Sequence, residues 1–430
     1  MRAIEVIKRH GVLFLLTLLL GGFAVVLGLN FVVSEKQVER TLDHIHGTED
    51  PQFQREMSLL FRTPIIDGNQ VDYLHNGDQI FPAMLEAIRE AEHFIALETY
   101  IYWSEQIGSE FSEALAERAR AGVAVHVVLD AVGSSSMDDT LVESMKSAGV
   151  QVHLYRPLHW YNLGRINNRT HRKLLIVDGR IAFTGGVGIA DQWLGNAQDS
   201  KHWRDAHFRL RGPAVSQMQA VFNDNWLQAT GTVLQGKTYF PSDSAAGSMR
   251  AQVFSSSPNS GSDSMQLMYL MAINAATREI DISASYFVPD RLTRATLVMA
   301  MRRGVRVRLV LPGEHIDTEI VRSASRANWG VLLREGAEIY EYQPTMFHTK
   351  VMVVDGLMTS VGSTNFDARS FSLNDEANLN IYDAAFAARM QSVFEDDIKR
   401  SNRVTYDLWK SRPWKERLAE ALAEPISSQL

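Results

Sequence analysis

The chain has 430 residues, of which 45% are hydrophobic and 22% are charged, and its formal net charge at pH 7 is −7. Such a composition is typical of a globular protein with enough apolar side chains for two cores, and it excludes an intrinsically disordered chain. The negative net charge argues against a nucleic-acid partner, and the absence of cysteine excludes disulfides and cysteine-ligated metal sites.

The N-terminal segment is the first predicted element. Residues 11–33, "GVLFLLTLLLGGFAVVLGLNFVV", carry no charge, and a helix of this length, rising about 1.5 Å per residue, spans the roughly 30 Å core of a bilayer. Arg2, Lys8 and Arg9 precede it, which predicts a cytoplasmic N-terminus and an exported body. The alternative is a cleaved signal peptide, whose apolar region is usually about 7–15 residues. We expect residues 1–34 to be an uncleaved anchor.

Two series of strands and helices follow a polar connector, residues 35–65. In the first series, "FIALETYIYW" and "VAVHVVLD" are predicted strands and "GSEFSEALAERARAG" is an amphipathic helix. This order predicts parallel strands with crossover helices. A Ser/Gly/Pro-rich seam at 241–264 separates this series from "REIDISASYFV", "RATLVMAMRRG" and "VRVRLVLP". We therefore expect two α/β lobes, residues 66–245 and 246–430, each a mixed sheet flanked by helices.

The two series correspond piece by piece, as an internal duplication does. Most telling is "HRKLLIVDGRIAFTGG", beginning at His171, against "HTKVMVVDGLMTSVGS", beginning at His348. Positions i and i+2 of a strand share a face, so each histidine points the same way as its lysine, Lys173 or Lys350. Four apolar residues after each lysine should anchor the strand, and the following Asp-Gly pair predicts a hairpin turn. Two lobes related by approximate two-fold symmetry would bring both His/Lys pairs to one cleft.

Such a cleft suits transfer of a phosphoryl group. One imidazole can attack phosphorus while the other protonates the leaving oxygen, because a pKa of about 6.5 lets neutral and protonated histidine coexist near neutrality. The lysines would neutralise the phosphoryl oxygens, so this chemistry needs neither cofactor nor metal. The nearest approaches to a metal site, His202 with His207 and His44 with His46, lack neighbouring ligand sets.

The doubled H-x-K-x4-D pattern, with glycines after it, resembles the phospholipase D superfamily from roughly residue 70 to the C-terminus. The N-terminal anchor, "ETYIYW" and "FSLNDEANL" are similar to its bacterial cardiolipin synthase branch. The resemblance implies a phosphohistidine intermediate, with His171 as nucleophile and His348 as acid and base, although the pseudo-symmetry lets these roles swap. It also implies that two phosphatidylglycerol molecules give cardiolipin and glycerol at the bacterial inner membrane. The motif residues it places in the catalytic set are His171, Lys173, Asp178, His348, Lys350 and Asp355.

The carboxylates need separate roles. Asp178 and Asp355 lie beyond the buried apolar run, so we expect them to brace the fold through backbone hydrogen bonds. A catalytic histidine also needs a carboxylate to fix its tautomer. Glu376 and Asp205 occupy corresponding places after the two motifs, and they are the candidates for orienting the histidines.

The two halves differ in their polar residues. Ser363 and Asn365 offer a hydroxyl and an amide to phosphoryl oxygens, whereas Gly186 and Gly188 occupy the matching positions of the first half, a departure from the family pattern. The backbone beside Gly186 would then cradle the anion.

The first half also carries 10 extra residues before its motif, within "LHWYNLGRINNRT". There Trp160, Tyr161 and Leu163 suit a bilayer interface, and Arg165 and Arg169 suit lipid phosphates. The alternative is an ordinary surface loop.

Two other functions stay open from the residues alone. One is a hydrolase of the same superfamily, in which water replaces the acceptor alcohol and the substrate is phospholipid or nucleic acid. The other is a membrane-tethered binding module without activity, which the glycines at 186 and 188 allow. The C-terminal stretch "WKERLAEALAEPI" predicts an amphipathic helix that either packs on the body or lies on a membrane.

Overall fold

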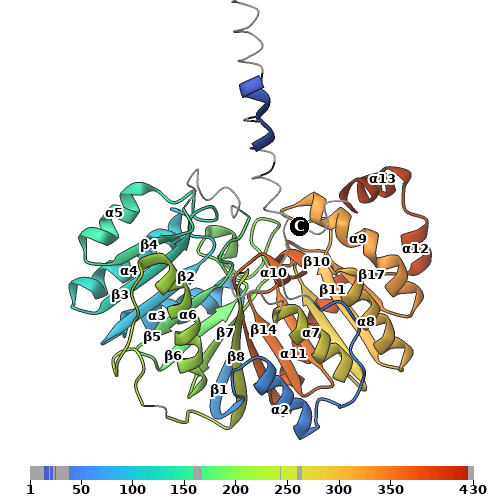
Figure 1. Ribbon diagram of the computed structural model, residues 1–430, viewed down its shortest axis with the longest axis horizontal. Helices are drawn as coiled ribbons and strands as arrows, with labels where there is room; N and C mark the ends of the chain where they lie inside the picture. The colour runs from blue at the N-terminus through green and yellow to red at the C-terminus, as the bar shows by residue number, and fades with distance from the viewer. Residues whose placement is uncertain are drawn as a thin grey trace, which may run out of the picture.

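The computed structural model shows two α/β lobes side by side, with their central strands converging between them (Figure 1). The residues that the structure describes are 14–18, 20–22, 25, 38–157, 167–242, 244–258 and 264–424. The predicted extra loop therefore lies outside the described residues from 158 to 166, and so does most of the predicted anchor.

Over its described residues, the first lobe has seven strands and four α-helices. Its strands are β1 (Ile66–His75), β2 (Phe94–Thr99), β3 (Ala124–Asp130), β4 (Gln151–Tyr155), β5 (Leu174–Val177), β6 (Ile181–Gly185) and β7 (Ala206–Arg211). Its helices are α3 (Asn76–Arg89), α4 (Gln106–Arg120), α5 (Asp139–Ser147) and α6 (Ala214–Thr230).

The second lobe repeats this plan and adds helices at its C-terminal end. Its strands are β8 (Met249–Ser256), β9 (Glu279–Ala284), β10 (Phe287–Val288), β11 (Arg306–Pro312), β12 (Glu338–Tyr342), β13 (Lys350–Val354), β14 (Met358–Gly362), β15 (Phe366–Asp367), β16 (Glu376–Tyr382) and β17 (Ser401–Val404). Its helices are α7 (Ser264–Ala275), α8 (Arg291–Arg302), α9 (Glu319–Arg334), α10 (Ala368–Ser372), α11 (Ala384–Ile398), α12 (Tyr406–Lys410) and α13 (Trp414–Ala423).

The strand order displays the duplication. The main sheet runs β17-β12-β11-β9-β13-β14-β16-β8-β1-β7-β6-β5-β2-β3-β4. Read outward from the β8–β1 contact, the strands of the two halves follow in the same order. Strands β2, β3 and β4 are parallel, as the alternating pattern predicts. Strands β5, β6, β7 and β1 pair antiparallel, and the sheet is therefore mixed.

Both motifs form the hairpins that their Asp-Gly pairs predict. Strand β5 pairs with β6, and β13 pairs with β14. Asp178 and Asp355 each have φ of +53°, and the following Gly179 and Gly356 have φ of +62° and +61°. Two consecutive positive φ angles are the requirement of a type I′ turn, which explains aspartate followed by glycine at both places.

A shared apolar core fixes the lobes relative to one another. It contains buried side chains of both lobes, among them Phe208 and Leu210 from β7 and Val361 and Leu379 from β14 and β16. Helices α6 and α11 supply further members, including Trp226. Because these side chains pack into one cluster, the histidine motifs of the two halves are held on a common scaffold.

The segment predicted as a connector also belongs to the second lobe. It contains a helix, α2 (Pro51–Leu60), whose Phe53 and Met57 are buried in the core of that lobe. Upstream of α2, His44 Nδ1 lies 2.6 Å from the carbonyl oxygen of Asn274. The connector is thus an integral part of the packing.

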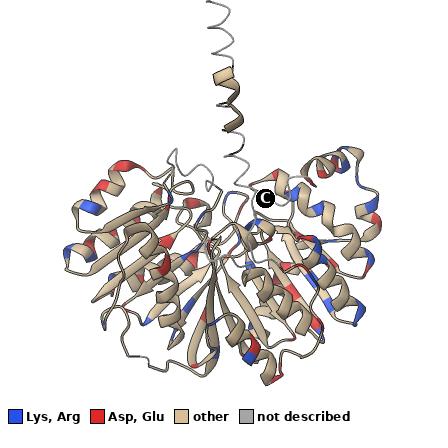
Figure 2. Cartoon of the chain, in the orientation of Figure 1, with Lys and Arg blue, Asp and Glu red and all other residues tan. Residues whose placement is uncertain are grey.

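Residues 14–18, 20–22 and 25 are helical. Figure 2 shows that this helical part carries no charge, whereas acidic and basic side chains are interspersed over both lobes. Within the described ranges, no helix is long and apolar enough to cross a membrane.

Candidate active site

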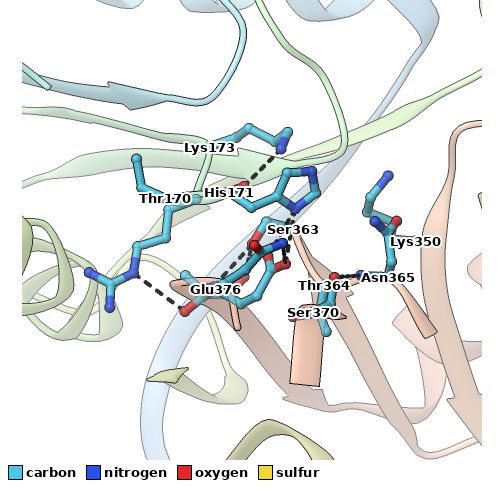
Figure 3. A network of polar contacts seen from close by, with 12 residues as sticks. Thr170, His171, Lys173, Lys350, Ser363, Thr364, Asn365, Ser370 and Glu376 are labelled. Atoms are coloured by element: carbon cyan, nitrogen blue, oxygen red, sulfur yellow. Dashed lines mark hydrogen bonds and ion pairs between the residues drawn. The ribbon is translucent and has the colours of Figure 1, made fainter. Parts of the chain in front are cut away.

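The position of His171 is set by the second lobe. His171 lies just before β5, and its backbone N–H donates to the carbonyl oxygen of Asp375 at 2.9 Å. This bond follows an isolated parallel bridge between Thr170 and Asp375. The next residue of the second lobe, Glu376, accepts at 3.0 and 3.1 Å from the ring Nδ1 of His171 (Figure 3). One strand edge of the second lobe therefore holds both the backbone and the ring of this histidine.

His348 is held by the first lobe in the same way. Its backbone N–H donates to the carbonyl oxygen of Arg204 at 2.8 Å, beside an isolated bridge between Arg204 and Phe347. Its ring Nδ1 lies 2.7 Å from Asp205 Oδ2. Each histidine is thus hydrogen-bonded to a carboxylate of the opposite lobe. These carboxylates are Glu376 and Asp205, the two acids that the sequence suggested for orienting the histidines.

The two lysines lie beside their histidines. Lys173 Nζ donates to the carbonyl oxygen of His171 at 2.8 Å and stands 5.8 Å from the ring centre of Tyr100. Lys350 Nζ donates to the carbonyl oxygen of His348 at 3.0 Å and to Ser285 Oγ at 2.8 Å. Burial lowers the pKa of both amines, that of Lys350 to about 8.

One cavity of about 370 Å³ is lined by residues of both lobes, including both histidines, whereas Lys350 lies outside its lining. His171, Lys173 and His348 line it together. The rest of its wall is aromatic, apolar and polar: Tyr100, Ile101, Arg169, Trp193, Trp203, Tyr286, Asp317, Thr318, Val321, Asn365, Asp367, Arg369 and Asn374. Among the residues that the structure describes, no three His, Asp or Glu side chains are grouped so as to hold a metal ion.

Burial sets the protonation of the histidines. Burial and the ammonium groups of Lys173 and Lys350 hold the pKa of His171 well below its usual 6.5. Burial and Lys350 also lower the pKa of His348, although Asp205 opposes this shift. Both imidazoles are therefore neutral near pH 7, and with Nδ1–H donated to a carboxylate each has a lone pair at Nε2. In His348 this atom lies 3.3 Å from Lys350 Nζ.

The two orienting carboxylates differ in charge. Burial raises the pKa of Glu376, and Lys173 opposes the shift. Burial also acts to raise the pKa of Asp205, but His348 and Lys350 outweigh it and the net direction is down. Asp205 therefore holds its negative charge more strongly than Glu376 does.

The motif aspartates are remote from this chemistry. Asp178 accepts three backbone N–H groups, those of residues 92, 93 and 94, at 2.8–2.9 Å. Asp355 accepts the backbone N–H groups of residues 277, 278 and 279 and the hydroxyls of Thr277 and Thr48. Neither aspartate lines the cavity. Asp178 and Asp355 therefore make the backbone hydrogen bonds of the bracing role expected from the sequence, and their place in the catalytic set, which the resemblance implies, stays a prediction.

The predicted anion contacts are also revised. The N–H of Gly186 donates to the carbonyl oxygen of Ala206 at 3.1 Å, so it is not directed at a ligand. The hydroxyl of Ser363 donates to Glu376 and acts through that carboxylate (Figure 3). Asn365 does line the cavity, and its Oδ1 accepts from Ser285.

Several wall residues were not anticipated. Trp193 donates its ring N–H to Asp205 at 2.9 Å and stands 5.4 Å from the ring of His348. Tyr100 lies 5.4 Å from the ring of His171. Tyr100 stands inside the quoted motif "ETYIYW", but nothing in the residue order distinguishes Trp193 from a core tryptophan. Arg169, predicted to meet lipid phosphate, lines the cavity while its guanidinium lies 3.7 Å from Asp130.

Comparison with known proteins gives a consistent result. A family model described as "Cardiolipin synthase, PLD-like domain" matches residues 84–226 and 269–398. "Cardiolipin synthase 1" of Bacillus anthracis is 34% identical over 377 residues, covering 85% of this chain and 74% of that protein. "Cardiolipin synthase" of Oceanobacillus iheyensis is 36% identical over 363 residues, covering 84% and 75% respectively. Among solved structures, phosphatidylserine synthase of Haemophilus influenzae shares the fold, with a TM-score of 0.68, 13% identity and coverage of 88% of this chain and 100% of that one.

Proposed function

Because the chain belongs to the phospholipase D-like family of cardiolipin synthases, we propose that its cavity joins two phosphatidylglycerol molecules into cardiolipin and releases glycerol. The protein is an enzyme, a phosphatidyltransferase of the cardiolipin synthase type. The observation that carries the proposal is that two histidines, each hydrogen-bonded to a carboxylate of the opposite lobe, line one cavity.

The first half-reaction forms a phosphohistidine. Nε2 of neutral His171 attacks the phosphorus of phosphatidylglycerol, and the bond from phosphorus to the glycerol oxygen breaks. His348, protonated to imidazolium in the complex with the anionic substrate, gives its Nε2 proton to that oxygen, and glycerol leaves. In the second half-reaction a hydroxyl of another phosphatidylglycerol gives its proton to His348 and attacks the same phosphorus. The P–N bond breaks, cardiolipin is released, and both histidines return to their first state.

The environments of the carboxylates support this division of roles. Transfer of a proton from His348 requires its imidazolium form, which an anionic Asp205 at 2.7 Å stabilises. The bound phosphodiester anion adds to this effect, because a nearby negative charge raises the pKa of an imidazole. His171 faces Glu376, whose pKa burial raises, and stays neutral as a nucleophile must.

The lysines supply the positive charge that phosphoryl transfer needs. Lys173 and Lys350 each donate to the backbone carbonyl of the neighbouring histidine, and Lys173 also lines the cavity. As ammonium groups they would neutralise the phosphoryl oxygens as charge develops in the transition state.

The membrane anchor is the remaining part of the proposal. Residues 1–34 would hold the enzyme in the bacterial inner membrane with the lobes on the exported side. The support is the uncharged sequence of 11–33 and the exposure of its described side chains, including Phe14 at 67% and Leu20 at 67%. A soluble domain rarely presents such side chains to water, whereas a bilayer accepts them.

Incubation of the purified full chain with phosphatidylglycerol tests the function. We expect cardiolipin and glycerol in equal amounts, resolved by thin-layer chromatography and mass spectrometry. Radiolabelled substrate should leave an acid-labile adduct on wild-type protein and none on His171→Ala. Release of phosphatidic acid without cardiolipin would replace transfer by hydrolysis, and labelling of His171→Ala at the wild-type level would refute the assigned nucleophile.

A further inference from the structure

The C-terminal helix α13 has one face that the described body leaves uncovered. Trp414, Leu418 and Leu422 are 68%, 51% and 70% exposed. They recur every four residues, and at about 100° per residue they form one stripe along the helix. Such a stripe on a surface helix is normally covered by a partner.

The opposite face of α13 is fixed to the second lobe. Ala423 is buried in a small cluster with Val288 and Val321. Glu416 lies 3.1 Å from Arg326, and Glu420 accepts from Arg412 at 2.6 Å. The two acids within α13 are therefore paired with arginines, Glu420 buried and Glu416 with 42% of its side chain exposed.

Three basic side chains at the end of α12 and on α13 are not paired in this way. Lys410, Lys415 and Arg417 are exposed, and none of them forms an ion pair with another described residue. On a helical wheel Lys415 and Arg417 flank the apolar stripe, one on each side. An apolar stripe bordered by cations is the pattern of a helix that lies in the interface of an anionic bilayer.

The helix is also connected to the active-site cavity. Val321, which packs with Ala423, is itself a wall residue of the cavity, and so is the adjoining Tyr286. In Figure 1, α13 and the described part of the N-terminal helix lie on the same edge of the molecule. Through Val321 and Tyr286, α13 therefore adjoins the wall of the chamber that would receive the lipid headgroup.

We propose that α13 is an interfacial helix that lays its Trp414/Leu418/Leu422 stripe into the surface of an anionic phospholipid bilayer and so seats the cavity against its substrate. This proposal rests on the proposed function, since a lipid substrate is what makes a bilayer the occupant. It assigns a role to the C-terminal stretch that the sequence left between packing and membrane contact.

A depth measurement on the full chain tests the contact. The protein has no cysteine, so Leu418→Cys carries a single bimane label. The control is Leu59→Cys, because Leu59 is a leucine on α2 that is even more exposed than Leu418, at 66% against 51%. In vesicles of phosphatidylglycerol and phosphatidylcholine with doxyl-labelled lipid, we expect quenching at position 418 at least about threefold stronger than at 59. Equal quenching at the two positions would overturn the proposal.

An activity measurement separates docking from support of the cavity wall. For Leu418→Glu/Leu422→Glu we expect turnover on phosphatidylglycerol vesicles to fall about tenfold and turnover on dissolved short-chain phosphatidylglycerol to stay unchanged. Leu59→Glu should change neither. Equal losses on both substrates, or unchanged turnover on vesicles, would contradict lipid docking.

Two further outcomes are decisive. If light scattering in detergent shows that the double variant dissociates a wild-type dimer, and position 418 is not quenched by lipid, the stripe binds a second copy and the proposal is wrong. If wild-type protein makes no cardiolipin from either substrate form, the proposed function fails, while the quenching comparison still decides whether α13 contacts lipid.

Discussion

Glu376 and Asp205 do the same task from opposite lobes with different supports. Glu376 accepts the hydroxyl of Ser363, whereas Asp205 accepts the ring N–H of Trp193 and the backbone N–H of Ala206. A Cβ at Gly186, the position matching Ser363, would lie 2.2 Å from Asp205 Oδ1. Position 186 therefore requires glycine, because Asp205 occupies the space that a side chain there would need. The replacement of the family's serine by Gly186 thus accompanies the use of an aspartate in place of a glutamate.

The Asp205 carboxylate should set the basic limb of the pH profile. Asp205 raises the pKa of His348 against the effect of burial, and His348 must carry a proton to release glycerol. Asp205→Asn removes that charge, so the pKa of His348 falls. As pH is raised, the variant should therefore lose activity at a lower pH than the wild-type protein does. We expect the basic limb of kcat to move down by about one unit.

The measurement is kcat against pH on short-chain phosphatidylglycerol. The control is Asp396→Asn, an exposed aspartate paired with Lys399, which should leave the profile in place. An Asp205→Asn profile that only drops in height, without a shift, would mean that the carboxylate positions the ring and does not stabilise its charge.

At the scale of residues, the sequence predicted the reacting side chains better than it predicted the residues that surround them. The His/Lys pairs and the acids Glu376 and Asp205 were identified because duplication makes a repeated polar residue stand out. The position of the second half that matches Trp193 is Ser370, so the duplication does not single out this tryptophan. Its contact with Asp205 depends on how the chain folds between residues 193 and 205. The contacts that Gly186 and Ser363 make in the structure were not foreseen, because the backbone partner of one and the carboxylate beside the other come from neighbouring strands.

The two Asp-Gly hairpins are the elements that hold the motif strands in register. In each, a carboxylate accepts the backbone N–H groups that precede a neighbouring strand, β2 in the first lobe and β9 in the second. The aspartate thereby ties the end of β5 or β13 to the strand beside it. This explains how a residue far from the cavity belongs to the repeated motif.

Loss of these carboxylates should affect stability more than catalysis. For Asp355→Ala we expect unfolding free energy to fall by about 3 kcal/mol, because buried donors lose a charged acceptor and alanine must adopt a positive φ. Asp178→Ala should cost less, since two of its three donors lie in exposed backbone. Urea unfolding in detergent gives both values.

Turnover of the folded enzyme is the control for that prediction. Asp355→Asn retains a side chain that tolerates positive φ and should recover part of the lost stability. A fall in kcat of a thousandfold in Asp355→Ala, with an unchanged unfolding midpoint, would restore the aspartate to the catalytic group.

Element prediction succeeded where the pattern was local. The strands β5 and β13 follow from runs of buried apolar residues, and the hairpins follow from Asp-Gly. The isolated bridges at Thr170 and Phe347 were not predicted, since each pairs residues from different lobes. The helix α2 was missed for the same reason, because its partners, Phe254 and others, lie about 200 residues away.

At the scale of the whole molecule, a buried ion pair joins the lobes beneath His348. Arg204 from the first lobe forms two hydrogen bonds, at 3.0 and 2.8 Å, with Asp397 on α11 of the second. Its backbone carbonyl meanwhile receives the N–H of His348. The ion pair therefore helps to fix the position of one lobe relative to the other next to His348.

Breaking this pair should destabilise the interface between the lobes. Arg204→Met leaves Asp397 buried and unpaired, and we expect a loss of about 3–5 kcal/mol in unfolding free energy. The double variant Arg204→Met/Asp397→Leu should recover most of it. Thermal and urea unfolding of the four proteins in the cycle measure the coupling, and additive losses would show that the pair does not bridge the lobes energetically.

The arrangement of two lobes was the largest feature that the sequence predicted. Duplication and the seam near residue 241 predicted two similar halves, and strand order confirms their correspondence. What could not be predicted is that each half lends its acid to the other, since this exchange is a property of the interface and not of either repeat.

That exchange has a consequence for descent. A forebear with a single lobe would have possessed an imidazole and an acid that could never meet within one chain. It could have worked only as a homodimer. Fusion of two copies of its gene would then have made the contact between the two lobes permanent. Once joined, the halves were free to diverge, one keeping aspartate with glycine and the other glutamate with serine.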